Sequence, residues 1–313
     1  MLRILDMALA YPAREQRLSE LETELALSRN QMRMYDRFFG FDRFRCDPGE
    51  PLARLTDRAA REVLARNPGQ DDRLSHVLHC HTLMNTAVAG GETSDVLGGF
   101  RDRGLEVFSA TMNHCATGVS MLGMLSHLLD EGQAALILIG EKAFHPAIRV
   151  IENTTIMGEA AAAILVAQEP ARPARGSYEV LGTHVLHETS FWKNTGLRGE
   201  PYLEGFDTIY QDFACAGIAR ALQRFGREAG QIRMVMPHNV NLPSWFHIAS
   251  ATGLSRAQIQ LSTIARYGHC FGADPFINLA ETAASGALDP GDQVLLYSIG
   301  LGATASCALL QVN

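Results

Sequence analysis

The sequence predicts an α/β fold in which helices cover both faces of the sheets and the chain consists of two similar halves. Two stretches echo each other: residues 129–140 read LDEGQAALILIG, and residues 288–300 read LDPGDQVLLYSIG. In each copy, a helix rich in small residues precedes a Leu-Asp-x-Gly turn and a continuously apolar strand. Such strands, alternating with helices, are typical of sheets buried on both sides. We therefore divide the chain into residues 1–170 and 171–313.

The first half is predicted to alternate strands and helices. Before the LDEG turn, the expected elements are a strand at 2–9, a Glu-rich helix at 18–27, a helix at 52–66, a strand at 73–80, a short strand ending at Met112 and a buried helix after Cys115. A further buried strand is expected at residues 160–167.

The second half follows a crossover at residues 169–175. Residues 183–208 are polar and aromatic without regular periodicity, so we expect a lid or binding loop there. A helix at 211–229, a strand at 233–236 and a last buried strand at 306–312 complete the predicted order.

Composition and charge exclude several function classes. The chain has 313 residues, of which 47% are hydrophobic and 19% charged, as expected of an ordered globular protein. Its net charge of −7 argues against nucleic-acid binding, and no apolar run approaches the roughly 20 residues of a membrane span. The N-terminal residues become charged too soon for a secretory signal, and the six cysteines lack CxxC spacing. We expect a cytoplasmic protein with free thiols.

No metal or cofactor is expected. His76, His79 and His81 lie close together, but no carboxylate or further histidine nearby completes a ligand set. The chain has no GxGxxG after a strand and no phosphate-cradling loop.

Cys115 lies at a strand-to-helix corner, within the stretch FSATMNHCATGVSMLGMLSHLL. Backbone N–H groups at such a corner have no helical partner, and their positive potential favours a thiolate over a thiol. The alternative interpretation is a small buried hydrophobic residue.

Two histidines turn this cysteine into a candidate nucleophile. His238 and His269 lie, as Cys115 does, where a strand ends and a loop or helix begins, the place where α/β folds gather catalytic groups. A thiolate can attack an acyl thioester and hold the acyl group, while imidazoles donate hydrogen bonds to an oxyanion or move protons.

These motifs resemble the β-ketoacyl carrier-protein synthase III branch of the thiolase superfamily. The resemblance rests on the Cys115 helix, on Pro-His-x-x-Asn at 237–241, on the tail at 267–310 and on Met-Gly-Glu-Ala-Ala at 157–161. It implies a five-layered αβαβα thiolase fold with two pseudo-twofold-related halves, and an isologous homodimer. It also implies that Cys115 is the acylated nucleophile and that His238 polarises a thioester carbonyl during decarboxylation of a malonyl-type extender.

The third catalytic position departs from the family pattern. Where the family normally has asparagine, this chain has His269. An imidazole can donate the same hydrogen bond, but it also titrates near neutral pH. Related Cys-His-His synthases form C–C bonds, whereas other members with an altered third residue pass the acyl group to a hydroxyl or amine, with the imidazole as general base. Both interpretations remain open.

Two further departures concern the thioester donor. Asp42 falls where a basic residue commonly contacts coenzyme A, which points to a carrier-protein donor, although Arg43 and Arg45 are close enough to compensate. Pro243 replaces a basic carrier-docking residue. The candidate replacements, for which an ordinary solvated face is the competing interpretation, are Arg220, Arg224 and Arg227.

The resemblance also implies residues around the acyl group. The glycine-rich loop at 298–303 would aim a backbone N–H at the thioester oxygen, with Leu301 or the neighbouring Gly302 pairing with Cys115 to form the oxyanion hole. The candidate substrate-binding residues are Asn241, His114, Phe144 and Trp192, and Phe191 and Tyr210 are further candidates for the wall of an acyl tunnel.

The sequence therefore predicts ping-pong acyl transfer through Cys115, using acyl-carrier-protein or acyl-CoA thioesters. The second half-reaction is expected to be decarboxylative condensation with a carrier-bound malonyl-type unit, in specialised-metabolite biosynthesis. The alternatives are acyl transfer to a hydroxyl or amine, and a non-catalytic partner subunit of a heteromeric synthase.

Overall fold

A computed structural model describes the whole chain except residues 83–93, 112, 144–148, 170–175 and 192–204. Its main sheet runs in the order β11 (Met234–Met236), β12 (Gln293–Gly300), β13 (Thr304–Val312), β10 (Tyr178–His187), β1 (Leu2–Ala10), β9 (Ala160–Gln168), β6 (Ala134–Glu141), β4 (Leu74–Cys80) and β5 (Glu106–Ala110). The two halves of the sheet meet where β1 pairs with β10, through Arg3 with Glu179 and Ile4 with Tyr178.

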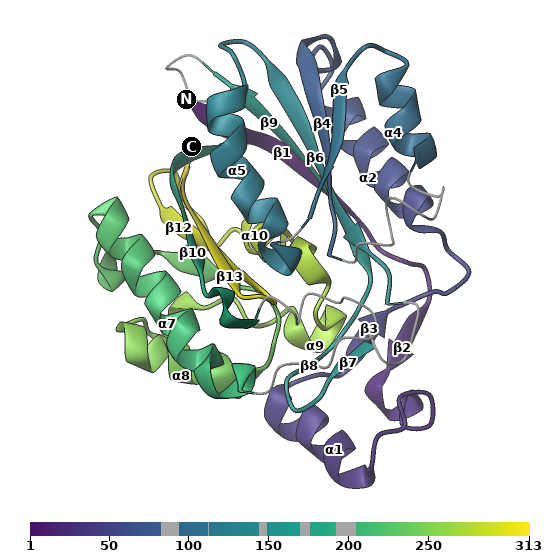
Figure 1. Ribbon diagram of the computed structural model, residues 1–313, viewed down its shortest axis with the longest axis vertical. Coiled ribbons are helices and arrows are strands. Elements are labelled where there is room, and N and C mark those ends of the chain that lie inside the picture. Colours follow the sequence, from purple (N-terminus) through teal and green to yellow (C-terminus); the bar gives the residue numbers. More distant parts are fainter. Residues whose placement is uncertain (83–93, 112, 144–148, 170–175, 192–204) are drawn as a thin grey trace.

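Helices form three layers around the two halves of this sheet (Figure 1). Helices α5 (Thr117–Leu128) and α10 (Asp274–Ala284) lie between the halves, and their buried residues share one apolar core with strands of both. Helices α2 (Leu52–Arg66) and α4 (Ser94–Arg101) cover the outer face of the first half. Helices α7 (Phe206–Phe225) and α8 (Leu242–Thr252) cover the outer face of the second. The predicted five-layered αβαβα arrangement is confirmed.

The topology of the first half recurs in the second. Strand β1 is antiparallel to β9, β9 is antiparallel to β6, and β6 is parallel to β4. In the same way, β10 is antiparallel to β13, β13 is antiparallel to β12, and β12 is parallel to β11. In the first half, β5 adds a further parallel strand beside β4. At the equivalent edge of the second half, Ile259 makes only a single parallel bridge to Val235 of β11. The echoing sequences therefore mark a real structural repeat.

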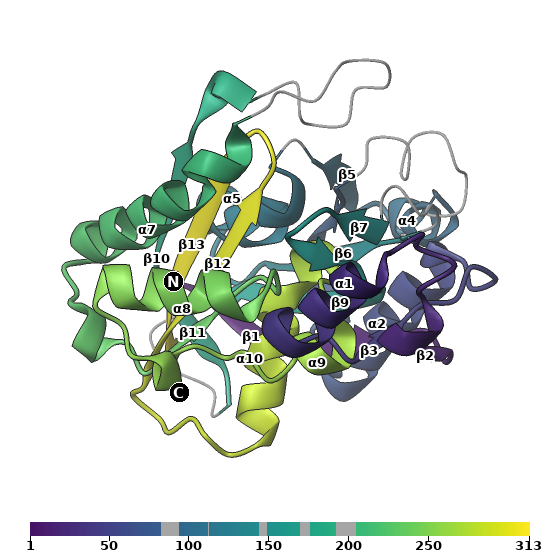
Figure 2. The ribbon, with the colours of Figure 1, turned by 90° about the horizontal axis from the view of Figure 1, so that it is seen from below.

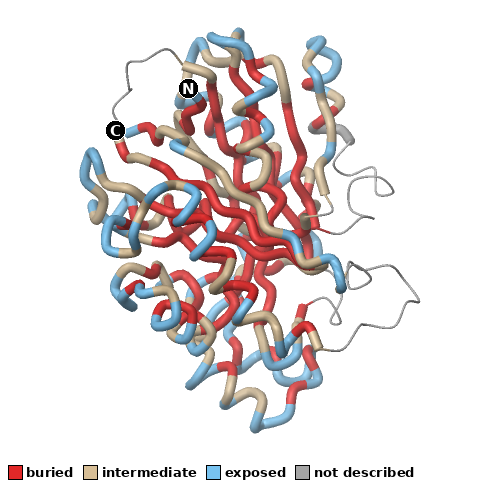
Figure 3. Tube along the Cα trace, turned by 60° about the vertical axis from the view of Figure 1, so that its left-hand side comes forward, coloured by how far each residue is buried: buried red, intermediate tan, exposed pale blue. Residues whose placement is uncertain are grey.

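Burial explains why the strands of this repeat are apolar throughout. All eight residues of β6 are buried, as are all residues of β9 but the last, because α2 packs on one face and α5 on the other. Figure 3 shows the buried positions concentrated along the strands and the central helices. No helix among the described residues is long and apolar enough to cross a bilayer.

The structure differs from two sequence expectations. The helix predicted at 18–27 is a 3-10 turn at Leu18–Glu20 followed by turns, whose leucines pack against Phe41 and Phe44. The loop predicted at 183–208 begins within β10, which runs to His187. Most of β10 is only half-buried, so its sequence lacks the apolar run of the other strands. The predicted boundary at 170/171 falls outside the described residues.

Several smaller elements lie near α8, at one end of the molecule (Figure 2). They are β2 (Glu15–Arg17), α1 (Arg29–Met34), a π-helical turn (Tyr35–Phe39), β3 (Arg43–Arg45), β7 (Val150–Ile151), β8 (Thr155–Ile156) and α9 (Ile264–Tyr267).

Candidate active site

Cys115 lies in a 3-10 turn, His114–Ala116, that leads directly into α5. The side chains of Val119, Leu122 and Leu125 anchor that helix in the central core, and the Cys115 carbonyl accepts a hydrogen bond of 2.8 Å from Ser298 Oγ. The residue is 8% exposed. The predicted strand-to-helix corner thus exists, and both halves of the chain hold the thiol in place.

His269 faces this thiol from the other half of the chain. Its Nε2 lies 3.4 Å from Cys115 Sγ, although the two residues are 154 positions apart. The backbone on either side is fixed: the His269 N–H donates to Ile156, and its carbonyl accepts from Gly158. A Cβ on Gly158 would overlap the carbonyl oxygen of Tyr267, so only glycine allows this approach.

Asp274 completes a line of three groups. Its carboxylate contacts Nδ1 of His269 and is fully buried. The same carboxylate accepts hydrogen bonds from the backbone N–H of Cys270, at 2.7 Å, and from that of Asn239, at 2.6 Å. Donors on two sides fix the carboxylate, which in turn orients the imidazole so that Nε2 faces the thiol.

The charges at this site favour a protonated His269. Burial alone would lower the pKa of His269, but the Asp274 carboxylate and the Cys115 sulfur raise it to about 10. The neighbouring charges therefore outweigh desolvation. The His269 imidazolium places a proton donor next to the Cys115 sulfur.

His238 follows β11 and lies beside His269, with ring centroids 6.2 Å apart. Its Nε2 is 2.7 Å from the hydroxyl of Tyr210, and its carbonyl accepts a hydrogen bond from the indole of Trp245. Burial, and then the charge of His269, lower the pKa of His238 to about 3, so its imidazole is neutral at pH 7.

The glycine-rich loop after β12 packs against the predicted nucleophile. A Cβ on Gly300 would overlap the carbonyl oxygen of Asn113, two residues before Cys115. Gly302 has a φ of 130°, which favours glycine, and Leu301 is half-buried beside it. The loop is adjacent to Cys115, while the oxyanion role of Leu301 and Gly302 stays a prediction.

The predicted substrate-binding residues lie in different settings. His114 is buried next to Cys115 in a left-handed conformation, with φ 49°, and burial lowers its pKa to about 4. Asn241 is the N-cap of α8: it accepts from the Ser244 N–H and donates to the Thr154 carbonyl. Both ends of its amide are thus used within the protein. Phe144 and Trp192 lie outside the described residues.

Sequence reasoning missed two polar partners of the site. Asp274 reads as an ordinary acidic residue in the first turn of a helix, although its place five residues after His269 was an available signal. Asn239, between the two predicted motif residues His238 and Asn241, donates its N–H to Asp274. Tyr210 was expected only as tunnel wall, and its bond to His238 depends on how α7 packs.

Other charged groups singled out in the sequence lie elsewhere. Arg43 pairs with Asp42 at 3.2 Å, so Asp42 does not face phosphate as an unpaired charge. Arg220 and Arg224 are exposed on α7, whereas Arg227 donates to Gln293.

The rings of His79 and His81 stack, and no cluster of three potential metal ligands occurs among the residues that the structure describes.

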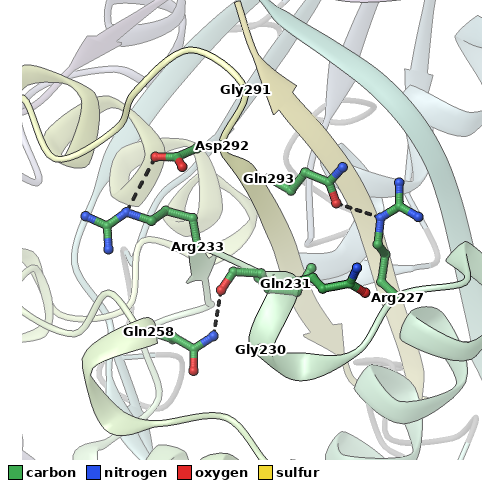
Figure 4. A pocket seen from close by; sticks show the side chains of 9 residues that line it. Arg227, Gly230, Gln231, Arg233, Gln258, Gly291, Asp292 and Gln293 are labelled. Atoms are coloured by element: carbon green, nitrogen blue, oxygen red, sulfur yellow. Dashed lines mark hydrogen bonds and ion pairs between the residues drawn. The ribbon is translucent and has the colours of Figure 1, made fainter.

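Arg227 lines a polar pocket at the far end of the second half (Figure 4). Arg233 and Gln293 also line it, and they stand at the starts of β11 and β12. His238 and Gly300 lie at the opposite ends of those strands, so this pocket is not part of the Cys115 site.

Comparisons with known proteins find relatives of one kind. Residues 222–312 match the family described as 3-oxoacyl-[acyl-carrier-protein (ACP)] synthase III C terminal. A β-ketoacyl-[acyl-carrier-protein] synthase III of Rhodospirillum rubrum is 25% identical over 212 residues, which are 63% of this chain and 65% of that protein, just under two thirds of its length. The same enzyme of Clostridium tetani is 32% identical over 95 residues, 30% of this chain and 28% of that protein.

Solved structures share the fold over nearly the whole chain. An acyltransferase named ChlB3 has a TM-score of 0.82 at 16% identity, covering 99% of this chain and 97% of its own. A β-ketoacyl-[acyl-carrier-protein] synthase III of Thermus thermophilus has a TM-score of 0.79 at 18% identity, covering 99% of both. OleA of Xanthomonas campestris, with bound lauric acid and lauroyl-CoA, has a TM-score of 0.81 at 18% identity, covering 99% of this chain and 98% of its own.

The layers, the repeat and these likenesses define a protein of the thiolase fold. More particularly, the chain is similar to β-ketoacyl-[acyl-carrier-protein] synthase III, through the family model that matches residues 222–312 and through the relative that is 25% identical over 63% of the chain.

Proposed function

We propose that this protein is an acyltransferase that takes an acyl group from a thioester onto Cys115 and passes it to a hydroxyl or amine. The observation that carries the proposal is the buried line of Cys115, His269 and Asp274. A nucleophile, a base and a carboxylate that orients the base form the relay used in covalent acyl transfer.

In the first half-reaction, the Cys115 thiolate attacks the thioester carbonyl. The new C–S bond gives a tetrahedral oxyanion, which the backbone N–H groups of Cys115 and of the loop at 301–302 would stabilise. As the old C–S bond breaks, the His269 imidazolium donates its Nε2 proton to the leaving thiolate. The products are an acyl-enzyme, a free thiol and a neutral His269.

Acylation itself prepares His269 for the second half-reaction. The charge of Cys115 is one of the causes that raise the pKa of His269, and forming the thioester removes that charge. Neutral Nε2 then accepts the proton of the acceptor hydroxyl or amine while its oxygen or nitrogen attacks the acyl carbon. Asp274 stabilises the imidazolium that forms, and Cys115 leaves as a thiolate, which restores the starting ion pair.

The names of the relatives support a thioester donor. The matched relatives are named as synthases of β-ketoacyl-[acyl-carrier-protein], and one OleA structure holds lauroyl-CoA. We therefore propose an acyl-carrier-protein or acyl-CoA thioester as donor. We also propose a homodimer as the working unit, from the family resemblance, and a role in specialised-metabolite biosynthesis, from the departures at His269, Asp42 and Pro243.

Decarboxylative condensation is the second candidate. It is favoured by His238, whose ring lies beside His269 and could share with it the oxygen of a malonyl-type thioester. In that case both imidazoles act as hydrogen-bond donors, and neither needs to accept a proton.

The variant His269→Asn separates the two candidates. Asparagine donates a similar hydrogen bond but cannot carry a proton, so acyl transfer predicts a large loss of both acyl loading and discharge. Retained turnover with release of carbon dioxide from a malonyl thioester would favour condensation. His247→Asn, at an exposed histidine on α8, is the matched control. Failure of the wild type to form any acyl-enzyme would favour a non-catalytic partner subunit.

A further inference from the structure

His238 is buried between aromatic rings of the second half of the chain. Its ring contacts Trp245 edge-to-face at 5.5 Å and Tyr297 at 6.1 Å, and the residue is 1% exposed. The indole N–H of Trp245 also fixes its carbonyl, at 2.9 Å. The ring therefore cannot turn to offer a different nitrogen without disturbing the core around it.

Its Nε2 already has a partner inside the protein. The Tyr210 hydroxyl lies 2.7 Å away, the distance of a well-formed hydrogen bond. Imidazole Nε2 has one bonding direction, as an N–H or as a lone pair, and Tyr210 occupies it in either tautomer. A thioester oxygen could use Nε2 only by displacing this hydroxyl.

Tyr210 is itself held in place. Its ring contacts Phe206 edge-to-face at 6.0 Å, on the first turns of α7, and Phe206 contacts Phe191 at 5.5 Å. Burial, then the charges of Cys115 and Cys215, raise the pKa of Tyr210 above its usual range, so the phenol keeps its proton. Tyr210 therefore remains a protonated phenol next to His238.

The hydrogen bond between Tyr210 and His238 matters because the two candidate reactions use His238 differently. Decarboxylation of a malonyl-type thioester breaks the bond to its carboxylate, releases carbon dioxide and moves the electron pair into an enolate, whose oxygen needs an N–H donor. Transfer to a hydroxyl or amine needs a base at Cys115, which is His269, and makes no enolate. Only the first reaction needs Nε2 of His238.

We propose that Tyr210 sets the acceptor specificity of this site by occupying Nε2 of His238, so that the acyl group on Cys115 passes to an oxygen or nitrogen nucleophile and not to a decarboxylating malonyl-type thioester. The inference rests on the proposed function, since it concerns the fate of the acyl-enzyme. It assigns Tyr210 the role of a specificity-determining residue.

The test compares the wild type with Tyr210→Phe, which removes only the hydroxyl. Each protein is loaded with an acyl thioester and checked by intact mass. It is then divided between hydroxylamine, as a nitrogen nucleophile, and malonyl-CoA labelled in its free carboxylate. We expect Tyr210→Phe to raise release of labelled carbon dioxide about ten-fold, as expected from freeing one hydrogen-bonding position, and to change discharge by hydroxylamine less.

Tyr297→Phe is the matched control, because it also removes a buried hydroxyl from a ring that touches His238. That hydroxyl donates to the Ala214 carbonyl and does not meet Nε2, so no gain in carbon dioxide release is expected. If Tyr210→Phe fails to fold, Tyr210→Leu removes the same hydroxyl.

The outcomes distinguish the role of Tyr210 from the proposed acyl transfer through Cys115. Loading at Cys115 with carbon dioxide release no higher in the Tyr210 variants than in the wild type overturns the inference alone. An equal gain in Tyr297→Phe also overturns it, since the effect would then come from loosened packing. A wild type that never loads overturns the proposed function and the inference with it.

Discussion

Asp274 and His269, five residues apart, meet at the start of α10, where the buried carboxylate holds Nδ1 of the imidazole and leaves Nε2 facing Cys115. The contact joins the loop after α9 to the first turn of the central helix α10. It converts two adjacent polar groups into a directed relay, because the carboxylate fixes both the orientation and the tautomer of the ring.

Asp274→Asn is expected to slow acyl discharge strongly while leaving the fold intact. The amide keeps the shape of the carboxylate but neither fixes the tautomer nor stabilises the imidazolium, and such losses are on the order of 10⁴-fold. Single-turnover discharge of loaded enzyme measures the effect. Asp292→Asn, which affects a surface pair with Arg233, is the control. Unchanged discharge in Asp274→Asn would contradict the relay.

The same pair makes stability depend on pH in a defined window. The folded pKa of His269, about 10, exceeds the ordinary value of 6.5, so the folded state binds the proton more tightly than the unfolded state does. The stabilisation is fully present below pH 6.5 and is lost as pH rises toward 10. Thermal melts from pH 6 to 10 should show the deficit of Asp274→Asn shrinking with rising pH. A deficit that is constant across the window argues against an imidazolium in the folded protein.

Gly300→Ala is expected to impair loading more than stability. Its new Cβ would meet the Asn113 carbonyl oxygen and push the loop at 301–302 away from Cys115. The rate of acyl-enzyme formation measures this displacement. Gly99→Ala, on α4 where a Cβ meets no atom within 4 Å, provides the comparison. Equal loading rates in the two variants would show that this loop does not support the reaction.

The homodimer predicted from the family resemblance has a candidate surface. Met124 and Leu128 on α5 are 38% and 40% exposed, and Leu181 on β10 is 38% exposed. Gly123 packs on Thr183, two residues from Leu181, which brings this part of α5 beside β10. The wild type should scatter light as a dimer, and Met124→Glu with Leu128→Glu as a monomer. Phe38→Glu, on a different exposed surface, should remain dimeric. A monomeric wild type would refute the dimer.

Much of the fold could be predicted because its signals are local. The repeated Leu-Asp-x-Gly turns and the continuously apolar strands reflect burial on both faces, which the structure confirms for β6 and β9. The leucines of residues 18–27 misled the periodicity argument. They pack into a satellite core with Phe41 and Phe44, and packing of that kind does not require a helix.

The site was only partly accessible from sequence. Cys115, His238 and His269 have the right chemistry and lie where strands end, so residue type and position indicated them. Asp274 and Tyr210 acquire their significance from partners that only folding supplies: one meets the His269 ring, the other the His238 ring from a helix 28 residues earlier. The five-residue spacing is a sequence signal for the contact of Asp274, but neither distance can be deduced from the sequence.

The central claim is that Cys115 carries the acyl group, and intact-protein mass spectrometry tests it most directly. The protein is mixed with a panel of acyl-CoA and acyl-carrier thioesters, and the mass is measured before discharge. We predict a mass gain of one acyl group with at least one donor, and none in Cys115→Ala. A gain that persists in Cys115→Ala would contradict the account, because the acyl group would then reside on another residue.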